Sequence, residues 1–272
     1  MPYTATKESL TVTEFVDYQH SYQHIKLTRG EDGILLVQLH SDNDFLRMGE
    51  TTHRDLTAAF RQIALDRANR VVIITGTGTD FIGPRADAPG GRTLTRQSNL
   101  ADEYAVWEEL AWTNQREMNN ALLDIPVPVI AAVNGPVRRH CEMPLYSDIV
   151  IASETASFED SAHFDLQDLV PGDGSHIWMT MLLGINRARA YMLTGEVITA
   201  EEALRWGLVK EVLPQQRVLE RAWEIARRIA EKSDSTLRFT RSLMVQPIKK
   251  QTLELQGMGL AYEALAAFGR GL

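Results

Sequence analysis

Three short apolar runs constrain the fold of this 272-residue chain more than any other feature. They cover residues 71–74, 127–133 and 148–152 and are rich in Val, Ile and Ala. Because they show little alternation of polar and apolar residues, they predict strands that are buried on both faces, as in parallel sheets. Helical periodicity covers residues 52–68, before the first run, and residues 101–123, between the first and the second. The alternation of strands and helices predicts an α/β core with a parallel component.

The rest of the chain shows three further patterns. Residues 23–40 alternate in polarity around Gly30 to Gly33, which predicts a hairpin of two strands. Residues 81–100 are rich in Gly and Pro and have no clear period, which predicts a long loop. Helical patterns dominate beyond Pro171, with Thr199 as an N-cap; they cover residues 174–183, 186–193, 200–206, 216–232, 234–245 and 251–268. These patterns predict an N-terminal extension over 1–22, a core over 23–213 and a C-terminal helical region over 214–272.

Charge and cysteine content limit the classes of partner. The net charge is −8 and the basic residues are scattered, which argues against binding to nucleic acid or to an anionic membrane. The single cysteine, Cys141, cannot form an internal disulfide. The chain has neither an apolar run of the length that a membrane span needs nor the apolar core of a signal peptide at its start. We therefore expect a cytoplasmic protein without nucleic-acid or membrane partners.

Candidate chemistry lies in the turns that follow the predicted strands. Gly135 follows the strand over 127–133 and lets the backbone turn sharply, with its N–H free for a ligand. A helix that began near Arg138 would add free N–H groups favourable to an oxyanion. His163 and Asp173 lie ten residues apart, so a loop can bring the carboxylate to one imidazole nitrogen. The other nitrogen would then be a general base of fixed tautomer.

Other interpretations of these residues stay open. Asp173, between two glycines, is equally consistent with a turn residue or a helix N-cap. Cys141 next to His140 is better explained as a buried, unreactive cysteine than as a thiolate–imidazole pair. No His, Cys or carboxylate cluster has the spacing of a zinc site, so we expect no metal. The chain also lacks a G-x-S-x-G elbow, a G-x-G-x-x-G motif and a P-loop.

Longer motifs carry a family resemblance. The run VPVIAAVNGPV…CEMPLYSDIVIASETASF, the upstream RVVIITGTGTDF and the downstream VPGDG…LLGINRARAYMLTGEVITAEEALRWGLVKEVLP resemble the crotonase, or enoyl-CoA hydratase/isomerase, superfamily over residues 23–232. The resemblance implies an α/β fold of the crotonase (ClpP-like) type, with a spiral of repeated ββα units. It also implies that the C-terminal helical region assembles the protein as a homotrimer or a dimer of trimers.

Departures from the usual superfamily pattern point to one branch. Arg138-Arg139-His140 replaces a run of glycines, and Pro84, which has no N–H, enters the first oxyanion loop. The altered set resembles the β-diketone hydrolase branch that includes 6-oxocamphor hydrolase. This resemblance implies a set of catalytic residues: His53, His140, His163, Asp173 and Glu263. Met48 stands where an aromatic hydrogen-bond donor is expected, and residues from Ile82 to 91 differ from the branch, so both segments are expected to shape the substrate pocket.

The branch implies hydrolysis of a 1,3-diketone at a C–C bond, giving a keto acid or a ketone plus an acid. We expect His163, oriented by Asp173, to activate water, and His140 with backbone donors near Gly135 to bind the oxyanion or the enolate. Glu263 and His53 would form a second pair that orients His140 or protonates the enolate carbon. No cofactor is expected, because the second carbonyl is the electron sink.

Two other functions stay open at this point. CoA chemistry (enoyl-CoA hydratase, isomerase or acyl-CoA hydrolase) is favoured by Glu142, which keeps the first-glutamate position of the superfamily. A catalytically silent scaffold or RNA-binding relative is disfavoured by the acidic charge and by the retained histidines and carboxylates.

Overall fold

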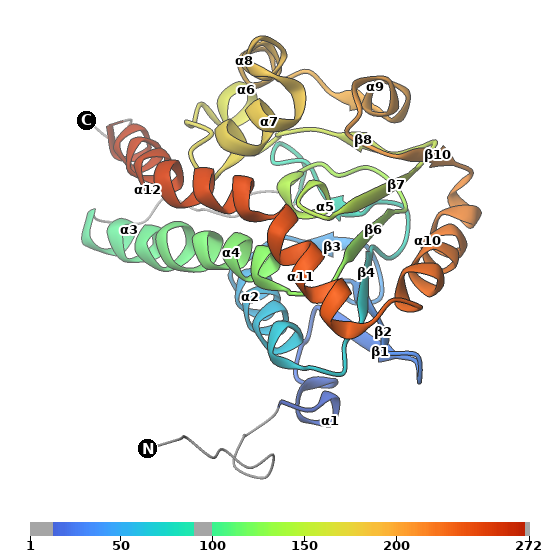
Figure 1. Ribbon diagram of the computed structural model, residues 1–272. Helices are drawn as coiled ribbons and strands as arrows, with labels where there is room; N and C mark the ends of the chain where they lie inside the picture. Colours follow the sequence, from blue (N-terminus) through green and yellow to red (C-terminus); the bar gives the residue numbers. More distant parts are fainter. Residues whose placement is uncertain (1–12, 90–99, 270–272) are drawn as a thin grey trace.

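A six-stranded sheet forms the centre of the computed structural model, which describes residues 13–89 and 100–269 (Figure 1). The strand order is β1-β2-β4-β6-β7-β10. The strands β1 (Ile25–Arg29) and β2 (Ile34–Leu39) form the predicted antiparallel hairpin. The other four continue the sheet in parallel: β4 (Val71–Thr75), β6 (Val129–Val133), β7 (Ile149–Ser153) and β10 (Glu211–Leu213). The hairpin and the three buried strands are confirmed.

Helices cover both faces of this sheet (Figure 1), which explains why its central strands are almost entirely apolar. Ile73 and its neighbours on one face pack against α10 (Gln215–Ala230). Ile74 and its neighbours on the other face join the larger core, to which α2 (Glu50–Leu65) and α4 (Arg116–Asp124) contribute. Every residue of β4 and β6 is buried.

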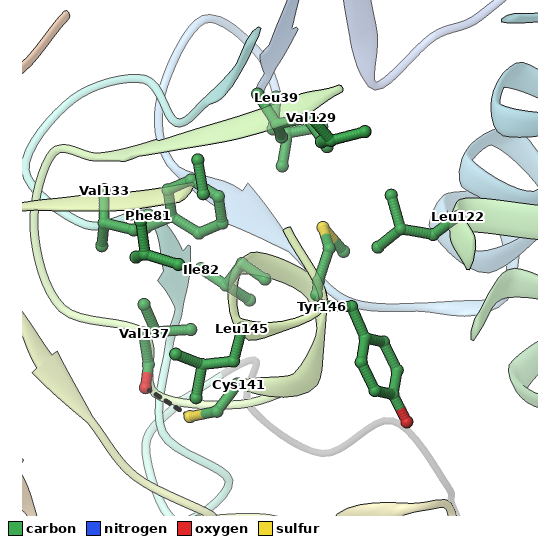
Figure 2. Packing of buried hydrophobic residues seen from close by; sticks show 14 of the residues in the cluster. Leu39, Phe81, Ile82, Leu122, Val129, Val133, Val137, Cys141, Leu145 and Tyr146 are labelled. Carbon is green, nitrogen blue, oxygen red and sulfur yellow. Dashed lines mark hydrogen bonds between the residues drawn. The ribbon is translucent and has the colours of Figure 1, made fainter. Parts of the chain in front are cut away.

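Figure 2 shows the part of the larger core next to the turn that follows β6. Cys141 is 2% exposed there, and its thiol donates to the carbonyl oxygen of Val137 at 3.4 Å and to that of Glu159 at 2.9 Å. Burial raises the pKa of this thiol well above its usual value. The prediction that Cys141 is buried is confirmed, and its raised pKa makes a reactive thiolate unfavourable.

Three sequence predictions about the first half of the chain need correction. The helix α2 ends at Leu65, because Asp66 is extended and its carboxylate accepts from the Tyr18 hydroxyl and from the backbone N–H of Ala68. The predicted loop over 81–100 begins with a strand, β5 (Ile82–Gly83), which pairs in parallel with β3 (Leu46–Arg47); residues 90–99 lie outside the described part of the chain.

The third correction concerns the predicted helix over 101–123. A continuous helical rod does cover these residues, from α3 (Leu100–Trp107) to α4 (Figure 1). The middle of the rod, η2 (Glu108–Gln115), is a π-helix instead of the expected α-helix. Stretches of π-helix are rare and frequently lie at functional sites.

The C-terminal helices agree with the predicted ones to within a few residues: α7 (Ser175–Leu183), α8 (Ile185–Thr194), α9 (Ala200–Trp206), α10, α11 (Asp234–Met244) and α12 (Gln246–Gly269). Thr199 caps α9 as predicted, since its hydroxyl accepts from the backbone N–H of Glu202 at 3.2 Å. Helix α12 begins five residues earlier than predicted, with Pro247 in its first turn, where a missing N–H costs nothing. None of the helices described here combines the length and the apolar character that crossing a membrane requires.

Several short elements were not predicted: α1 (Phe15–Tyr18), α5 (Glu142–Leu145), α6 (Phe164–Gln167), and the antiparallel pair β8 (Ser157–Phe158) and β9 (Ile198–Thr199). Elements of two to four residues give too short a pattern for periodicity to reveal. Two of them lie next to predicted site residues: α6 follows His163 directly, and α5 begins two residues after His140.

Candidate active site

The five predicted catalytic residues lie in two buried clusters that adjoin. We call one the Gln115 cluster; it consists of His53, Gln115, His140 and Glu142. We call the other the His163 cluster; it consists of Asp160, His163, Asp173 and Glu263. The clusters meet where His140, Glu142 and Asp173 each bring one side-chain N or O atom within 4.8 Å of the others. The fold thus assembles the site from segments that are distant in sequence, including α2, η2 and α12.

The turn after β6 positions His140. Val137 lies between Ile82 and Phe158 in isolated parallel bridges, and Arg138 is held by Asp80 at 2.6 Å and by Glu159 at 3.3 Å. His140 itself adopts the left-handed backbone conformation, with φ of 53°. The expected helix does not begin near Arg138: α5 begins at Glu142, so His140 precedes it.

Hydrogen bonds connect all four members of the Gln115 cluster. Nδ1 of His140 lies 2.8 Å from Oε1 of Glu142, and the rings of His53 and His140 meet edge to face at 5.1 Å. The Gln115 amide nitrogen lies 2.9 Å from Glu142 Oε1 and 3.2 Å from His140 Nδ1. The Gln115 amide oxygen lies 2.9 Å from Nε2 of His53. Gln115 is the last residue of the π-helix, so the widened turn sets where this side chain enters the site.

Three carboxylates surround the imidazole of His163. Nδ1 lies 2.6 Å from Oδ1 of Asp160, while Nε2 lies 3.6 Å from an oxygen of Asp173 and 3.6 Å from an oxygen of Glu263. The expectation that Asp173 orients the ring is wrong in one respect, because Asp160 holds Nδ1 at the shorter distance. Asp173 also receives the backbone N–H and hydroxyl of Ser175 on its other oxygen. Asp173 is thus a turn residue that receives Ser175, but Gly174 and not Asp173 is the N-cap of α7. The catalytic role of Asp173 stays a prediction.

Two glycines allow Glu263 to reach the His163 cluster from helix α12. A Cβ on Gly172 would lie 2.1 Å from the carbonyl oxygen of Gly259, and one on Gly259 would lie 2.4 Å from that of Gly172. Any larger residue at either position would push α12 away from the turn that carries Asp173. Gln256, on the same helix, donates to the backbone oxygen of Asp173 at 2.9 Å and ties the two segments together.

The environment shifts the pKa values of the His163 cluster. Burial alone would lower the pKa of His163, but Asp160 and Asp173 outweigh it and raise this pKa well above its usual value. Burial would raise the pKa of Asp173, but His163 and His140, together with the hydrogen bonds from Ser175, outweigh it and lower this pKa. Burial raises the pKa of Glu263 to about 7 despite the nearby His163. His163 is thus an imidazolium, Asp173 is an ionised carboxylate, and Glu263 is a carboxyl group that gains and loses a proton near neutral pH.

The charges in the Gln115 cluster are arranged differently. Burial and then the neighbouring His140 lower the pKa of His53 to about 3, so its ring is neutral. The predicted pairing of His53 with Glu263 is wrong, because both ring nitrogens of His53 face other groups, the Gly49 carbonyl oxygen and Gln115. Arg139 is 5% exposed beside both clusters, and burial lowers the pKa of its guanidinium to about 10, against the opposite effect of Asp160, Asp173 and Glu142.

The three predicted binding residues lie in packed positions. Met48 and Ile82 are buried in the larger core. Gly135 is required by close packing, since a Cβ there would lie 1.9 Å from the carbonyl oxygen of Thr79. No described hydrogen bond or close contact joins Gly135 to the two clusters. Its assignment as an oxyanion donor, and those of Met48 and Ile82 as pocket residues, stay predictions.

The fold also brings together three groups that could bind a metal ion, His140, Glu142 and Asp173, which sequence spacing does not reveal. Nδ1 of His140 is already hydrogen-bonded to Glu142, and one oxygen of Asp173 receives Ser175. We assign no metal to them, and the absence of a metal stays a prediction.

The comparisons with known proteins agree with this fold. The family model for enoyl-CoA hydratase/isomerase matches residues 29–260. The chain belongs to this family. Its α/β fold, with a C-terminal helical region, is the crotonase fold that the sequence predicted. A probable enoyl-CoA hydratase from Rhizobium meliloti is 31% identical over 239 residues, which are 87% of this chain and 84% of the relative.

Solved structures include one relative outside the CoA enzymes. A β-diketone hydrolase from the cyanobacterium Anabaena sp. PCC 7120, bound to (S)-3-oxocyclohexyl acetic acid, is 37% identical to this chain, with a TM-score of 0.86. The match covers 97% of this chain and 100% of the hydrolase. An enoyl-CoA hydratase from Mycobacterium avium subsp. paratuberculosis, at 22% identity, has a TM-score of 0.73 over 90% of this chain and 91% of its own and so supports the fold alone.

Sequence reasoning missed Gln115 and Asp160, and gave Arg139 and Glu142 no partner within the site. Asp160 lies three residues before His163, a spacing that could have suggested it as the partner of Nδ1. Gln115 had no usable signal, because its place depends on the π-helix.

Proposed function

We propose that this chain hydrolyses a carbon–carbon bond of a 1,3-diketone. The observation that carries the proposal is the contact between the two clusters, where His140, with its ring nitrogen on Glu142, adjoins Asp173 of the His163 cluster. A retro-Claisen hydrolysis needs proton transfer at one carbonyl and charge stabilisation at a second. Two adjoining polar clusters suit this reaction, because one can transfer protons at the first carbonyl while the other stabilises charge at the second. Similarity to the Anabaena β-diketone hydrolase over almost the whole chain supports the same function.

Glu263, rather than His163, is the proton acceptor in this proposal. The carboxylates keep His163 in its charged form, so it cannot accept a proton from water until it has lost one. The pKa of Glu263, about 7, suits a general base at neutral pH, and its Oε2 is buried without a hydrogen-bond partner among the described residues. His163 then acts through Nε2–H as a donor to the oxyanion that forms when water adds.

The steps balance without a cofactor. Glu263 takes one proton from water, and the hydroxide oxygen bonds to the first carbonyl carbon. The tetrahedral oxyanion collapses, the C–C bond breaks, and its electron pair moves into the second carbonyl as an enolate. His140 binds the enolate oxygen, and Glu263 returns its proton to the enolate carbon. The products are a ketone and an acid, or a single keto acid when the diketone is cyclic.

A direct assay tests the proposal. Purified protein is incubated with cyclic and linear 1,3-diketones, and loss of the enol absorbance is followed beside enoyl-CoA and acyl-CoA controls. We expect turnover of a diketone and loss of that turnover in Glu263→Gln. The matched control is Glu254→Gln, since Glu254 lies on the same helix with its side chain half exposed. Turnover of the CoA substrates alone would refute the proposal.

CoA thioester chemistry is the second candidate. It is favoured by the curated relatives, such as the Rhizobium meliloti protein, that are named enoyl-CoA hydratases, and by Glu142 at the first-glutamate position. Two features disfavour it. Oε1 of Glu142 is already engaged by His140 and Gln115, and the turn carries bulky Arg138 and Arg139 where backbone donors would need to be open.

A further inference from the structure

The backbone carbonyl of Asp173 is held by two buried carboxamides that come from different helices. Nδ2 of Asn119, on α4, donates to this oxygen at 3.2 Å, and Nε2 of Gln256, on α12, donates to it at 2.9 Å. A carbonyl oxygen can only accept, so both amide nitrogens have to face it, and the two donors use both of its lone pairs. The exposed fractions of Asn119, Asp173 and Gln256 are 1%, 6% and 2%, so water does not compete for these bonds.

The turn around Asp173 needs support from outside, because glycines flank it. Gly172 and Gly174 leave the backbone with few steric restrictions, and Gly174 has a φ of 129°, which residues with a side chain rarely adopt. The bonds from Ser175 to the Asp173 carboxylate are local and move with the turn. The two carboxamides come from outside the turn. Together with the close packing of Gly172 on α12, they fix where the Asp173 backbone lies.

Each of the two helices also places a residue in the active site. Gln115 lies four residues before Asn119 on the same rod, and Glu263 lies seven residues after Gln256 on α12, so each pair shares a helix face. Gln115 belongs to one cluster and Glu263 to the other. The Asp173 oxygen is therefore a point where hydrogen bonds join the elements that carry the two clusters.

Asn119 is unfavourable as a residue that serves packing alone. Its Oδ1 is buried without a hydrogen-bond partner among the described residues, and an amide oxygen in that position opposes folding. Leucine has a similar branched shape and would bring no such oxygen. With leucine there, the Asp173 carbonyl would keep its bond from Gln256. A positional role explains an asparagine at this place better than packing does.

We propose that Asn119 and Gln256 are positioning residues that set the distance between the two clusters through the backbone oxygen of Asp173. The Asp173 carboxylate lies 3.6 Å from Nε2 of His163 and, at the same time, within 4.8 Å of a ring nitrogen of His140. In the proposed hydrolysis the clusters act on the two carbonyls of one substrate, so their separation has to match the 1,3 spacing. The inference rests on the proposed function for this last step alone.

Two asparagine variants separate positioning from packing. Asn119→Leu should be at least as stable in urea as the unmodified protein, while kcat for a diketone falls by about 10-fold, as expected from one hydrogen bond, and KM stays nearly unchanged. Asn69→Leu is the matched control. Asn69 is 1% exposed and lies outside both clusters; it donates to the carbonyl oxygen of Ile63 at 3.0 Å and accepts from Arg29 at 3.0 Å. This variant should lose stability and keep kcat.

Nitrogen-15 NMR of the His163 ring tests the positioning without turnover. The two ring signals are assigned by their loss in His163→Gln. The variant that carries both Asn119→Leu and Gln256→Met should show a shifted Nε2 signal, because Nε2 faces Asp173. The Nδ1 signal should stay in place, because Nδ1 bonds Asp160. In the same double variant, kcat should fall on the order of 10²-fold.

The outcomes distinguish this proposal from the proposed function. If no diketone is turned over but the Nε2 signal moves in the double variant, the function is wrong and the positioning is right. If the Nε2 signal and kcat both stay unchanged in folded Asn119→Leu and in the double variant, the positioning is overturned. Asn119→Leu alone gives the same comparison if the double variant does not fold. Asn69→Leu should leave both ring signals in place.

Discussion

Replacing Glu263 by Gln should stabilise the protein while it abolishes turnover. The side chain is 4% exposed, and burial raises its pKa from 4.5 to about 7. Between these two pH values the folded state binds more protons than the unfolded state, so stability falls as the pH rises. At about 1.36 kcal/mol per pKa unit, ionised Glu263 costs the folded state about 3 kcal/mol at pH 8 and about 1 kcal/mol at pH 5. Gln keeps the shape and cannot ionise.

Urea unfolding at pH 5, 6, 7 and 8 measures this effect. The stability of Glu263→Gln relative to the unmodified protein should increase by about 2 kcal/mol from pH 5 to pH 8. The fixed difference between an amide and an acid cancels in this comparison. Glu254→Gln, which removes an exposed carboxylate from the same helix, should show no such increase. A relative stability of Glu263→Gln that is independent of pH would refute the reasoning that assigns Glu263 the role of base.

Four further predictions follow from the site and from the helical region. Asp160→Asn removes the carboxylate on Nδ1 of His163, so the pKa of His163 should fall in an NMR titration and turnover should drop on the order of 10²-fold. His140→Gly should relieve a left-handed backbone by about 1 kcal/mol in urea unfolding yet eliminate diketone turnover. Dialysis against a chelator should leave diketone turnover unchanged. A loss of turnover that an added divalent cation restores would contradict the expected absence of a metal. Light scattering should show three or six chains, and Leu253→Glu, at a side chain 87% exposed on α12, should reduce that number.

Most of the fold could be predicted because each strand and helix is encoded by a pattern of neighbouring residues. The strands β4, β6 and β7 are apolar at every buried position except their last residues, Thr75 in β4 and Ser153 in β7, so their sequence alone identifies them. The C-terminal helices carry regular amphipathic patterns and recognisable caps such as Thr199. The π-helix left no such mark, because its extra residue per turn changes the direction of side chains without changing the composition. Gln115 was therefore missed, although the surrounding helix was predicted.

The role of each site residue was harder to predict than which residues lie in the site. The resemblance named His163 and Glu263, but a role depends on which charges lie within a few ångströms. Asp160 at 2.6 Å, with two more carboxylates at 3.6 Å, makes His163 a cation. The same enclosure gives Glu263 a pKa near neutrality. Sequence separation conveys neither distance, so the sequence revealed neither Asp160 beside His163 nor the raised pKa on which the proposed role of Glu263 rests.

The replacement of glycine by histidine in the turn after β6 connects these results. A non-glycine residue in the left-handed region costs on the order of 1 kcal/mol or more, so the turn keeps His140 only because its surroundings hold it there. Arg138 anchors the preceding residues to Asp80 and Glu159, and Glu142 bonds the His140 ring from the start of α5. Arg138 in the turn, Glu142 in α5 and Gln115 in the π-helix thus hold His140 in its strained conformation. Because a turn of glycines would need none of this support, the Gln115 cluster is best explained as a structure built to place the His140 imidazole.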